Sequence, residues 1–128
     1  MIFSAYKNGG ASADAGEYLL EFSGFLINFG NGFDLSNGIF TAQRKGNYEF
    51  SVAAYHSAAG SSDLTVEHND ALVLSFHTWE RTGDYSDDTL SFSWIMELQQ
   101  GDVVRLKVSS GRFYCGPNYN CIFSGKYI

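Results

Sequence analysis

The residues best suited to hold a metal ion lie in one acidic segment, 79–88, which reads Trp-Glu-Arg-Thr-Gly-Asp-Tyr-Ser-Asp-Asp. Asp84, Asp87 and Asp88 fall close together in it, and the neighbouring glycine favours a loop. Calcium takes several hard oxygen ligands from flexible loops. The three aspartates are therefore a candidate calcium site, with an ordinary acidic surface loop as the alternative.

The same segment carries groups that suit a sugar ligand. Trp79 and Tyr85 offer aromatic faces for stacking on a sugar, and Arg81 can pair with a carboxylate such as that of sialic acid. Loops carry recognition more often than the strands that position them. We therefore expect Trp79, Arg81 and Tyr85 to contact a ligand, with Trp79 packed at a strand end as the alternative.

A second cluster of candidate ligand-binding residues surrounds the two cysteines. Arg112, Tyr114 and Tyr119 lie beside Cys115 and Cys121, which enclose the sequence Gly-Pro-Asn-Tyr-Asn. Such a segment can turn back on itself, so a disulfide across the neck of the loop is feasible. We predict this disulfide, which indicates an oxidising compartment. Two free buried thiols are the alternative.

Motifs for catalysis are missing from the sequence. It has no Gly-x-Ser-x-Gly elbow, no phosphate-binding Gly-Lys-Ser/Thr loop and no His-Glu-x-x-His. His56, His68 and His77 stand apart on different predicted strands or turns, which is typical of ordinary surface or core histidines. The cysteines lack zinc-site spacing, and Asp87 and Asp88 are adjacent, unlike a glycosidase pair. We predict that the protein is not an enzyme and requires no cofactor, calcium being the one candidate.

Composition limits the partners that this chain can have. Its 128 residues allow one domain, 1–128, and carry a net charge of -6. Between positions 63 and 102 nine acids face a single base, which argues against nucleic-acid binding. No apolar run reaches the roughly 20 residues that span a bilayer, so we expect no membrane insertion. No signal peptide is present, so we expect a mature or excised domain, or export by another route.

Alternation of apolar and polar residues predicts a protein made of strands. Positions 90–98 and 104–108 alternate, as do 48–54 and 72–76, and no stretch has helical periodicity. Fourteen glycines supply turns. Ala58 to Ser62 and Asn8 to Gly16 are expected to be loops. Ten strands are predicted, at 2–6, 18–22, 25–28, 38–42, 46–56, 63–68, 71–78, 89–98, 102–109 and 121–128. This pattern fits an all-β antiparallel jelly-roll sandwich.

A spaced set of aromatics, glycine and asparagine resembles the signature of one family: Phe22, Asn28, Phe33, Phe40, Gly46, Tyr48 and Phe50. Four blocks resemble the same family in the right order: Phe3-Ser4-Ala5, Asn37-Gly38-Ile39-Phe40-Thr41-Ala42, the segment 98–106 (Leu-Gln-Gln-Gly-Asp-Val-Val-Arg-Leu) and Phe123-Ser124-Gly125. Together they resemble the C1q globular-head family across nearly the whole chain. The final aromatic of the family pattern is replaced by Val52.

The resemblance implies a ten-stranded jelly roll shared with tumour necrosis factor ligands and assembled as a homotrimer. It implies a secreted, extracellular protein of innate immunity that binds a glycan or protein ligand through apical loops, like the stalkless lectins of the family. It also implies that the loop around Asp84, Asp87 and Asp88 supplies calcium ligands. Two alternatives stay open: a cytokine-like or synapse-organising ligand for a receptor, and a trimerisation domain of a longer extracellular protein.

The resemblance also assigns structural roles. The aromatic rings Phe22, Phe33, Phe40, Tyr48 and Phe50 are expected in the core or in a trimer interface. Gly46 and Gly125 are expected to serve backbone geometry. The sequence His68-Asn69-Asp70 replaces the Asn-Gly turn usual between the middle strands, and we expect it still to form a tight hairpin.

Overall fold

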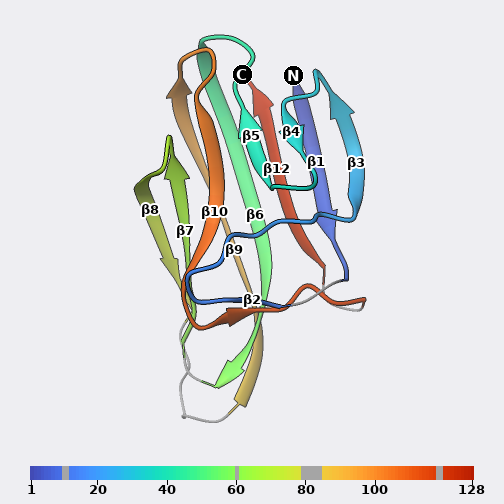
Figure 1. Ribbon diagram of the computed structural model, residues 1–128, viewed down its shortest axis with the longest axis vertical. Helices are drawn as coiled ribbons and strands as arrows, with labels where there is room; N and C mark the ends of the chain where they lie inside the picture. Colours follow the sequence, from blue (N-terminus) through green and yellow to red (C-terminus); the bar gives the residue numbers. More distant parts are fainter. Residues whose placement is uncertain (10–11, 60, 79–84, 118–119) are drawn as a thin grey trace.

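Every regular element in the described part of the chain is a β-strand (Figure 1). The computed structural model describes residues 1–128 apart from 10, 11, 60, 79–84, 118 and 119. The strands are β1 (Ile2–Lys7), β2 (Ala13–Asp14), β3 (Gly24–Phe29), β4 (Phe33–Asp34), β5 (Ile39–Thr41), β6 (Gly46–Ala59), β7 (Asp63–His68), β8 (Ala71–His77), β9 (Tyr85–Leu98), β10 (Val103–Ser110), β11 (Arg112–Phe113) and β12 (Cys121–Tyr127).

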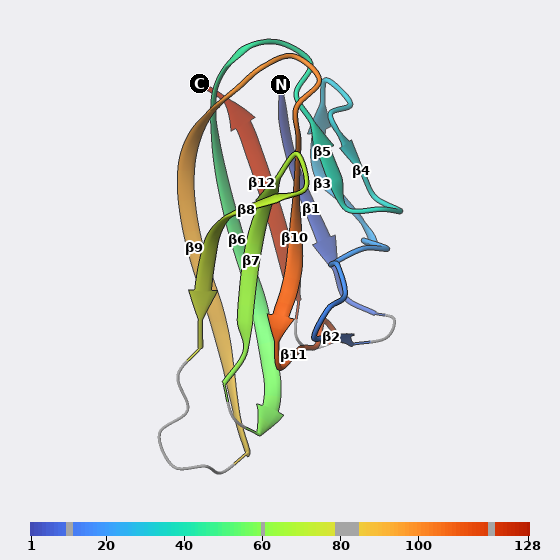
Figure 2. The same cartoon turned by 60° about the vertical axis from the view of Figure 1, so that its left-hand side comes forward.

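Two antiparallel sheets form the sandwich. The larger sheet has the order β2-β11-β6-β12-β1-β3, with β9 also paired to β6, and the smaller has the order β4-β5-β10-β7-β8. β6 and β9 are the longest strands and pair from Gly46 opposite Leu98 to Ala59 opposite Tyr85. Figure 2 shows β7 and β10 lying over β6 and β12. The prediction of an all-β jelly roll is confirmed.

Aromatic rings fill the space between the two sheets. The predicted core rings are buried, with Tyr48 and Phe50 fully so. Phe3 stacks on Phe33 with ring centroids 4.6 Å apart, and its edge meets Phe123 at 5.3 Å. Because the strands alternate inward and outward positions, β1, β6 and β12 send phenylalanine and tyrosine rings inward, whereas β7 and β10 send leucine and valine inward. The expected core role of these rings is confirmed.

The two glycines assigned to backbone geometry have a different reason to be glycine. Neither Gly46 nor Gly125 has a positive φ. A Cβ atom on Gly125 would lie 2.6 Å from the Phe3 ring and 2.7 Å from the Phe50 ring, and one on Gly46 would enter the Tyr127 ring. Close packing of aromatic side chains excludes a Cβ atom at both positions.

The tight hairpin predicted between β7 and β8 is confirmed. Asn69 and Asp70 both have positive φ, at 51° and 67°, as in the primed turns that suit two-residue hairpins. The Asp102 carboxylate accepts hydrogen bonds from Asn69 Nδ2 at 3.1 Å and His68 Nε2 at 2.9 Å. These bonds tie the β7–β8 turn to the neighbouring β9–β10 turn.

The predicted strand at 18–22 is wrong. Lys7 is buried, and its Nζ donates hydrogen bonds to the carbonyl oxygens of Leu20 at 2.8 Å and Glu21 at 3.2 Å. Glu21 also has a φ of 56°, outside the β region. The segment is therefore held as a loop against the sandwich. Burial lowers the pKa of Lys7, and the nearby Glu21 charge opposes this shift.

Two predicted loops are shorter than expected, and the strand count differs. Ala58 and Ala59 extend β6, and 85–88 extend β9, because these two stretches pair with each other. The short strand β2 interrupts the predicted loop at 8–16. The described residues form twelve strands rather than ten; β2, β4 and β11 have two residues each.

Candidate functional site

The candidate site is the end of the sandwich opposite the two chain termini, here called the distal end. It is where β6 ends, β7 begins, β8 ends, β9 begins and β10 passes into β11. Both termini lie at the other end (Figure 1). The described residues that build the distal end are Ser62, Asp63, His77, Thr78, Ser110, Arg112 and the two cysteines.

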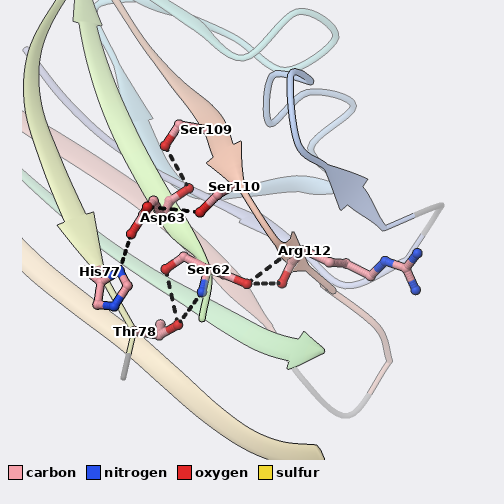
Figure 3. Close-up of polar contacts among 7 residues, drawn as sticks. All are labelled: Ser62, Asp63, His77, Thr78, Ser109, Ser110 and Arg112. Carbon is pink, nitrogen blue, oxygen red and sulfur yellow. Dashed lines mark hydrogen bonds and ion pairs between the residues drawn. The ribbon is translucent and has the colours of Figure 1, made fainter. Parts of the chain in front are cut away.

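Ser62 is the centre of a buried polar framework at the distal end (Figure 3). Its backbone N–H donates to Thr78 Oγ1 at 2.8 Å, and Thr78 Oγ1 donates to the Ser62 carbonyl oxygen at 3.1 Å. Ser62 Oγ accepts from the Arg112 N–H at 2.9 Å. Gly111, with a φ of 72°, leaves no room for a Cβ atom beside Ser62. Because buried polar groups are costly unless paired, these bonds fix the bases of three connecting segments together.

Asp63 organises the neighbouring surface. Its carboxylate accepts hydrogen bonds from His77 Nδ1 and from Ser110 Oγ, the latter at 2.9 Å, and Ser109 Oγ contacts its backbone oxygen at 3.4 Å (Figure 3). Asp63 and His77 are both partly exposed. The cluster therefore presents a carboxylate, an imidazole and hydroxyls at one exposed place. His77 is thus hydrogen-bonded to a carboxylate rather than isolated.

The predicted disulfide is confirmed. Cys115 and Cys121 are bonded and buried, with Cα atoms 5.3 Å apart. Arg112 and Tyr114, two predicted ligand residues, precede the disulfide at the distal end. Arg112 Nε donates to Asp14 Oδ1 at 2.6 Å, so this arginine already has a carboxylate partner. The half-buried Tyr114 donates its backbone N–H to the β6 strand. The disulfide loop is therefore anchored to β2 and β6.

The remaining predicted ligand residues fall mostly outside the described structure. Trp79, Arg81 and Tyr119 lie among the residues that the structure does not describe. Tyr85 was expected in a loop but is the first residue of β9, where it pairs with Ala59. Its backbone therefore belongs to the distal end, as do Arg112 and Tyr114.

The expected calcium loop does not match the observed backbone. Asp87 and Asp88 belong to β9 and pair with Ser57 and His56, so they are strand residues rather than loop residues. Asp84 lies outside the described residues, and the described ones contain no group of three acidic, histidine or cysteine residues that could hold a metal ion. The expected loop backbone is wrong for Asp87 and Asp88, whereas calcium binding by the three aspartates stays a prediction.

Comparison with protein families shows which family the chain belongs to. A model of the C1q domain matches residues 2–128. The chain belongs to the C1q domain family. Domains of this family are generally ligand-binding modules outside the cell rather than enzymes. In the described part of this C1q domain, no helix is long and apolar enough to span a membrane.

Solved structures similar to this C1q domain share its sandwich. The globular domain of zebrafish complement 1qA aligns with a TM-score of 0.80 and 23% identity, covering 99% of this chain and 96% of that one. Eiger TNF from S. frugiperda aligns with a TM-score of 0.75 and 10% identity over 99% and 93%. Murine APRIL aligns at 0.68 and 12% over 98% and 99%. At these identities the similarity shows the fold alone.

Proposed function

We propose that this C1q domain is an extracellular recognition module that works as a homotrimer and binds glycans at its distal end. The observation that carries the proposal is the hydrogen-bonded framework around Ser62 and Asp63. It fixes the bases of three connecting segments at the end opposite the termini. Such a rigid base is what a set of recognition loops requires, because less ordering entropy is lost when a ligand binds.

Two separate apolar surfaces support the trimer. The first, the sheet-face surface, is on the outer side of the larger sheet and consists of Ile2, Ile27, Phe29 and Ile95, which are 36% to 71% exposed. The ion pair of Glu49 with Lys126 lies between Ile95 on β9 and the other three residues on β1 and β3. The second, the edge surface, is where the open edges of β8 and β9 meet and consists of the half-buried Leu74, Phe76, Phe92 and Trp94. Folds of this family generally form trimers.

These two surfaces are different, so they suit a head-to-tail contact between copies. If the edge surface of one copy covers the sheet-face surface of the next, the same contact repeats around an axis and closes into a ring. Phe76 and Phe92, stacked with centroids 3.6 Å apart, would then be buried. Three copies would present three distal ends in one direction, and weak sites would gain avidity for a multivalent glycan.

The glycan proposal assigns a carboxylated sugar to the distal end. Arg81 would pair with the carboxylate, and Trp79 or Tyr85 would stack on the sugar ring. The test is binding of sialyllactose by the wild type and by Arg81→Ala, with Lys45→Ala, an exposed cation elsewhere, as the control. We expect loss of binding only in Arg81→Ala. Equal binding by both variants would contradict the assignment.

A role as a signalling ligand for a receptor is the competing proposal. Binding measurements on the same purified wild-type protein distinguish it from glycan recognition. A cell-surface protein bound at nanomolar affinity without competition by any sugar would favour signalling over glycan recognition.

Calcium binding stays a prediction for Asp84, Asp87 and Asp88. Titration calorimetry with calcium on the wild type and on Asp84→Asn tests it, and a missing heat of binding in the wild type would remove it.

A further inference from the structure

The turn between β3 and β4 carries one of three Asn-Gly pairs in the chain, which are Asn8-Gly9, Asn31-Gly32 and Asn37-Gly38. In such a pair the backbone nitrogen of the glycine reaches the asparagine side chain without obstruction, because glycine has no Cβ atom. We propose that Asn31 is a site of spontaneous deamidation, in which water is the only co-reactant. This modification is independent of the function proposed above. Asn8-Gly9 precedes residues that the structure does not describe, so Asn37-Gly38 is the pair for comparison.

The reaction joins the backbone nitrogen of Gly32 to the side-chain carbon Cγ of Asn31. Hydroxide removes the proton from the Gly32 nitrogen, which then attacks Cγ and leaves the negative charge on Oδ1. When the carbonyl forms again, the bond from Cγ to Nδ2 breaks, and this nitrogen takes a proton from water and leaves as ammonia. Water then opens the succinimide ring at either carbonyl and gives aspartate or isoaspartate. Nothing is oxidised or reduced, and the hydroxide consumed in the first step is regenerated.

The backbone nitrogen of Gly32 is available for this reaction. Among the described residues its N–H donates no hydrogen bond, whereas the Gly32 carbonyl oxygen accepts one from the Thr41 N–H at 2.8 Å. The turn is therefore held at the carbonyl of Gly32 and not at its nitrogen. Asn31 has a φ of 54° and is exposed to the solvent that supplies hydroxide. An N–H without a partner gives up no hydrogen bond when it reacts.

The neighbouring asparagine, Asn28, polarises the side chain that is attacked. Asn28 Nδ2 donates a hydrogen bond to Asn31 Oδ1 at 3.3 Å. Oδ1 is the atom that becomes negatively charged, and a donor aimed at such an atom lowers the barrier. Asn28 belongs to β3 and pairs with Phe3 of β1, so the sheet holds its backbone in place. The fold thus brings both a free nucleophile and an assisting donor to Asn31.

The comparison pair, Asn37-Gly38, lacks the free nucleophile. The Gly38 N–H donates to the Asp34 carbonyl oxygen at 2.9 Å, and this bond has to break before the nitrogen can attack. Gly38 also has a φ of 69°, and a Cβ atom on it would lie 2.1 Å from the Leu19 carbonyl oxygen, so its backbone is tightly enclosed. Asn37 Oδ1 accepts from the Ile39 N–H at 3.0 Å, which polarises it but also fixes the side chain. We therefore expect Asn37 to react more slowly.

The surroundings of Gly32 indicate that the product disturbs the turn. The turn lies at the end of the sandwich that carries both termini (Figure 1). Gly32 is buried, and a Cβ atom on it would lie 2.8 Å from Met1 Sδ and 2.9 Å from Phe40 Cε1. Isoaspartate adds one carbon atom to the main chain immediately before this residue. Because the neighbouring atoms leave no free space, the isoaspartate form should unfold at a lower Tm.

The experiment follows the full chain in mildly alkaline buffer by peptide mapping with mass spectrometry. The mass gain from replacing NH₂ by OH reports deamidation, and labelling by an isoaspartyl methyltransferase identifies isoaspartate. In the folded protein Asn31 should react about tenfold faster than Asn37, because breaking the Gly38 hydrogen bond costs about 1.4 kcal/mol. In urea the two pairs should react at similar rates. Asn31→Gly suits the positive φ and cannot react, so only the wild type should develop a second, lower Tm during incubation.

A second comparison tests the assisting donor. Asn28→Ala should slow the reaction at Asn31 about fivefold, since one exposed hydrogen bond is worth about 1 kcal/mol. Asn47→Ala, which removes an exposed amide elsewhere, is the matched control and should leave the rate unchanged. Faster reaction at Asn31 that disappears in urea supports the proposal. An intact Asn31, or equal rates at Asn31 and Asn37 in the folded protein, overturns it. Equal rates in wild type and Asn28→Ala overturn the role given to Asn28.

Discussion

Gly125 lies in β12 between two rings of the core. A Cβ atom there would be 2.6 Å from Phe3 and 2.7 Å from Phe50, and both rings are buried. Neither ring has space to move, because Phe3 also packs on Phe33 and Phe50 also packs on Trp94. The sequence indicated that this glycine matters but not why, since the contacts come from strands far apart in the chain.

We therefore predict that Gly125→Ala lowers the free energy of unfolding by about 2 kcal/mol, the usual cost of overpacking a core. Gly9→Ala is the matched control, because its added methyl group would meet nothing within 4 Å. Urea unfolding followed by circular dichroism measures both. Equal stability of the two variants would contradict the packing role.

Asp102 is the residue whose titration should affect stability. Hydrogen bonds from the Asn69 amide first, then from the Gln99 N–H and His68, lower its pKa from 3.8 to about 2. A lowered folded-state pKa stabilises the fold above pH 3.8, and this contribution is lost as the pH falls toward 2. Asp102→Asn should therefore flatten the fall of Tm between pH 5 and pH 2, measured by calorimetry. Glu97→Gln is the control, and equal slopes in wild type and Asp102→Asn would contradict the prediction.

At the scale of elements, contacts between residues distant in sequence determine whether a segment is a strand or a loop where the local sequence pattern gives the wrong answer. The segment 18–22 looks like a strand, but Lys7 binds the carbonyl oxygens of Leu20 and Glu21 and holds it as a loop. The polar residues at 85–88 look like a loop, but pairing with β6 makes them a strand. In both cases the deciding partner is on another part of the chain.

The pairing register of β7 and β8 determines in the same way which residues meet Asp63 at the distal end. A regular hairpin closed at Asn69 and Asp70 would set Asp63 opposite Phe76. An irregularity between Val66 and Glu67 shifts the pairing by one residue and brings His77 opposite Asp63 instead. No feature of the sequence marks this shift, so the hydrogen bond between Asp63 and His77 could not be predicted. The disulfide could be predicted, because it depends only on the short segment between its cysteines.

The disulfide loop provides the prediction at this scale. In the chain-entropy model, closing a loop with a sequence separation of 6 stabilises by about 2 kcal/mol. Replacing both Cys115 and Cys121 by alanine should lower the free energy of unfolding by this amount. The β6–β9 pairing should survive, which amide hydrogen exchange can check. A variant as stable as the wild type would contradict the role assigned to the disulfide.

At the scale of the whole molecule, the fold class and the family follow from spacing that is visible in the sequence. Apolar residues at every second position of successive strands, aromatic in several of them, favour a sandwich core, and the structure has one. The sequence does not reveal which apolar residues stay uncovered. Ile95 is 65% exposed although it lies among core residues in sequence, because its outward position on β9 has no second layer above it.

The association of three copies is the claim on which the proposed function depends most. Light scattering coupled to size-exclusion chromatography measures it directly. We expect a mass three times the 14.1 kDa of one chain for the wild type and for Lys45→Glu, an exposed position outside both apolar surfaces. Ile95→Glu should give a folded single chain, because it places a charge on the sheet-face surface. A wild-type mass of one chain at every concentration would contradict the account.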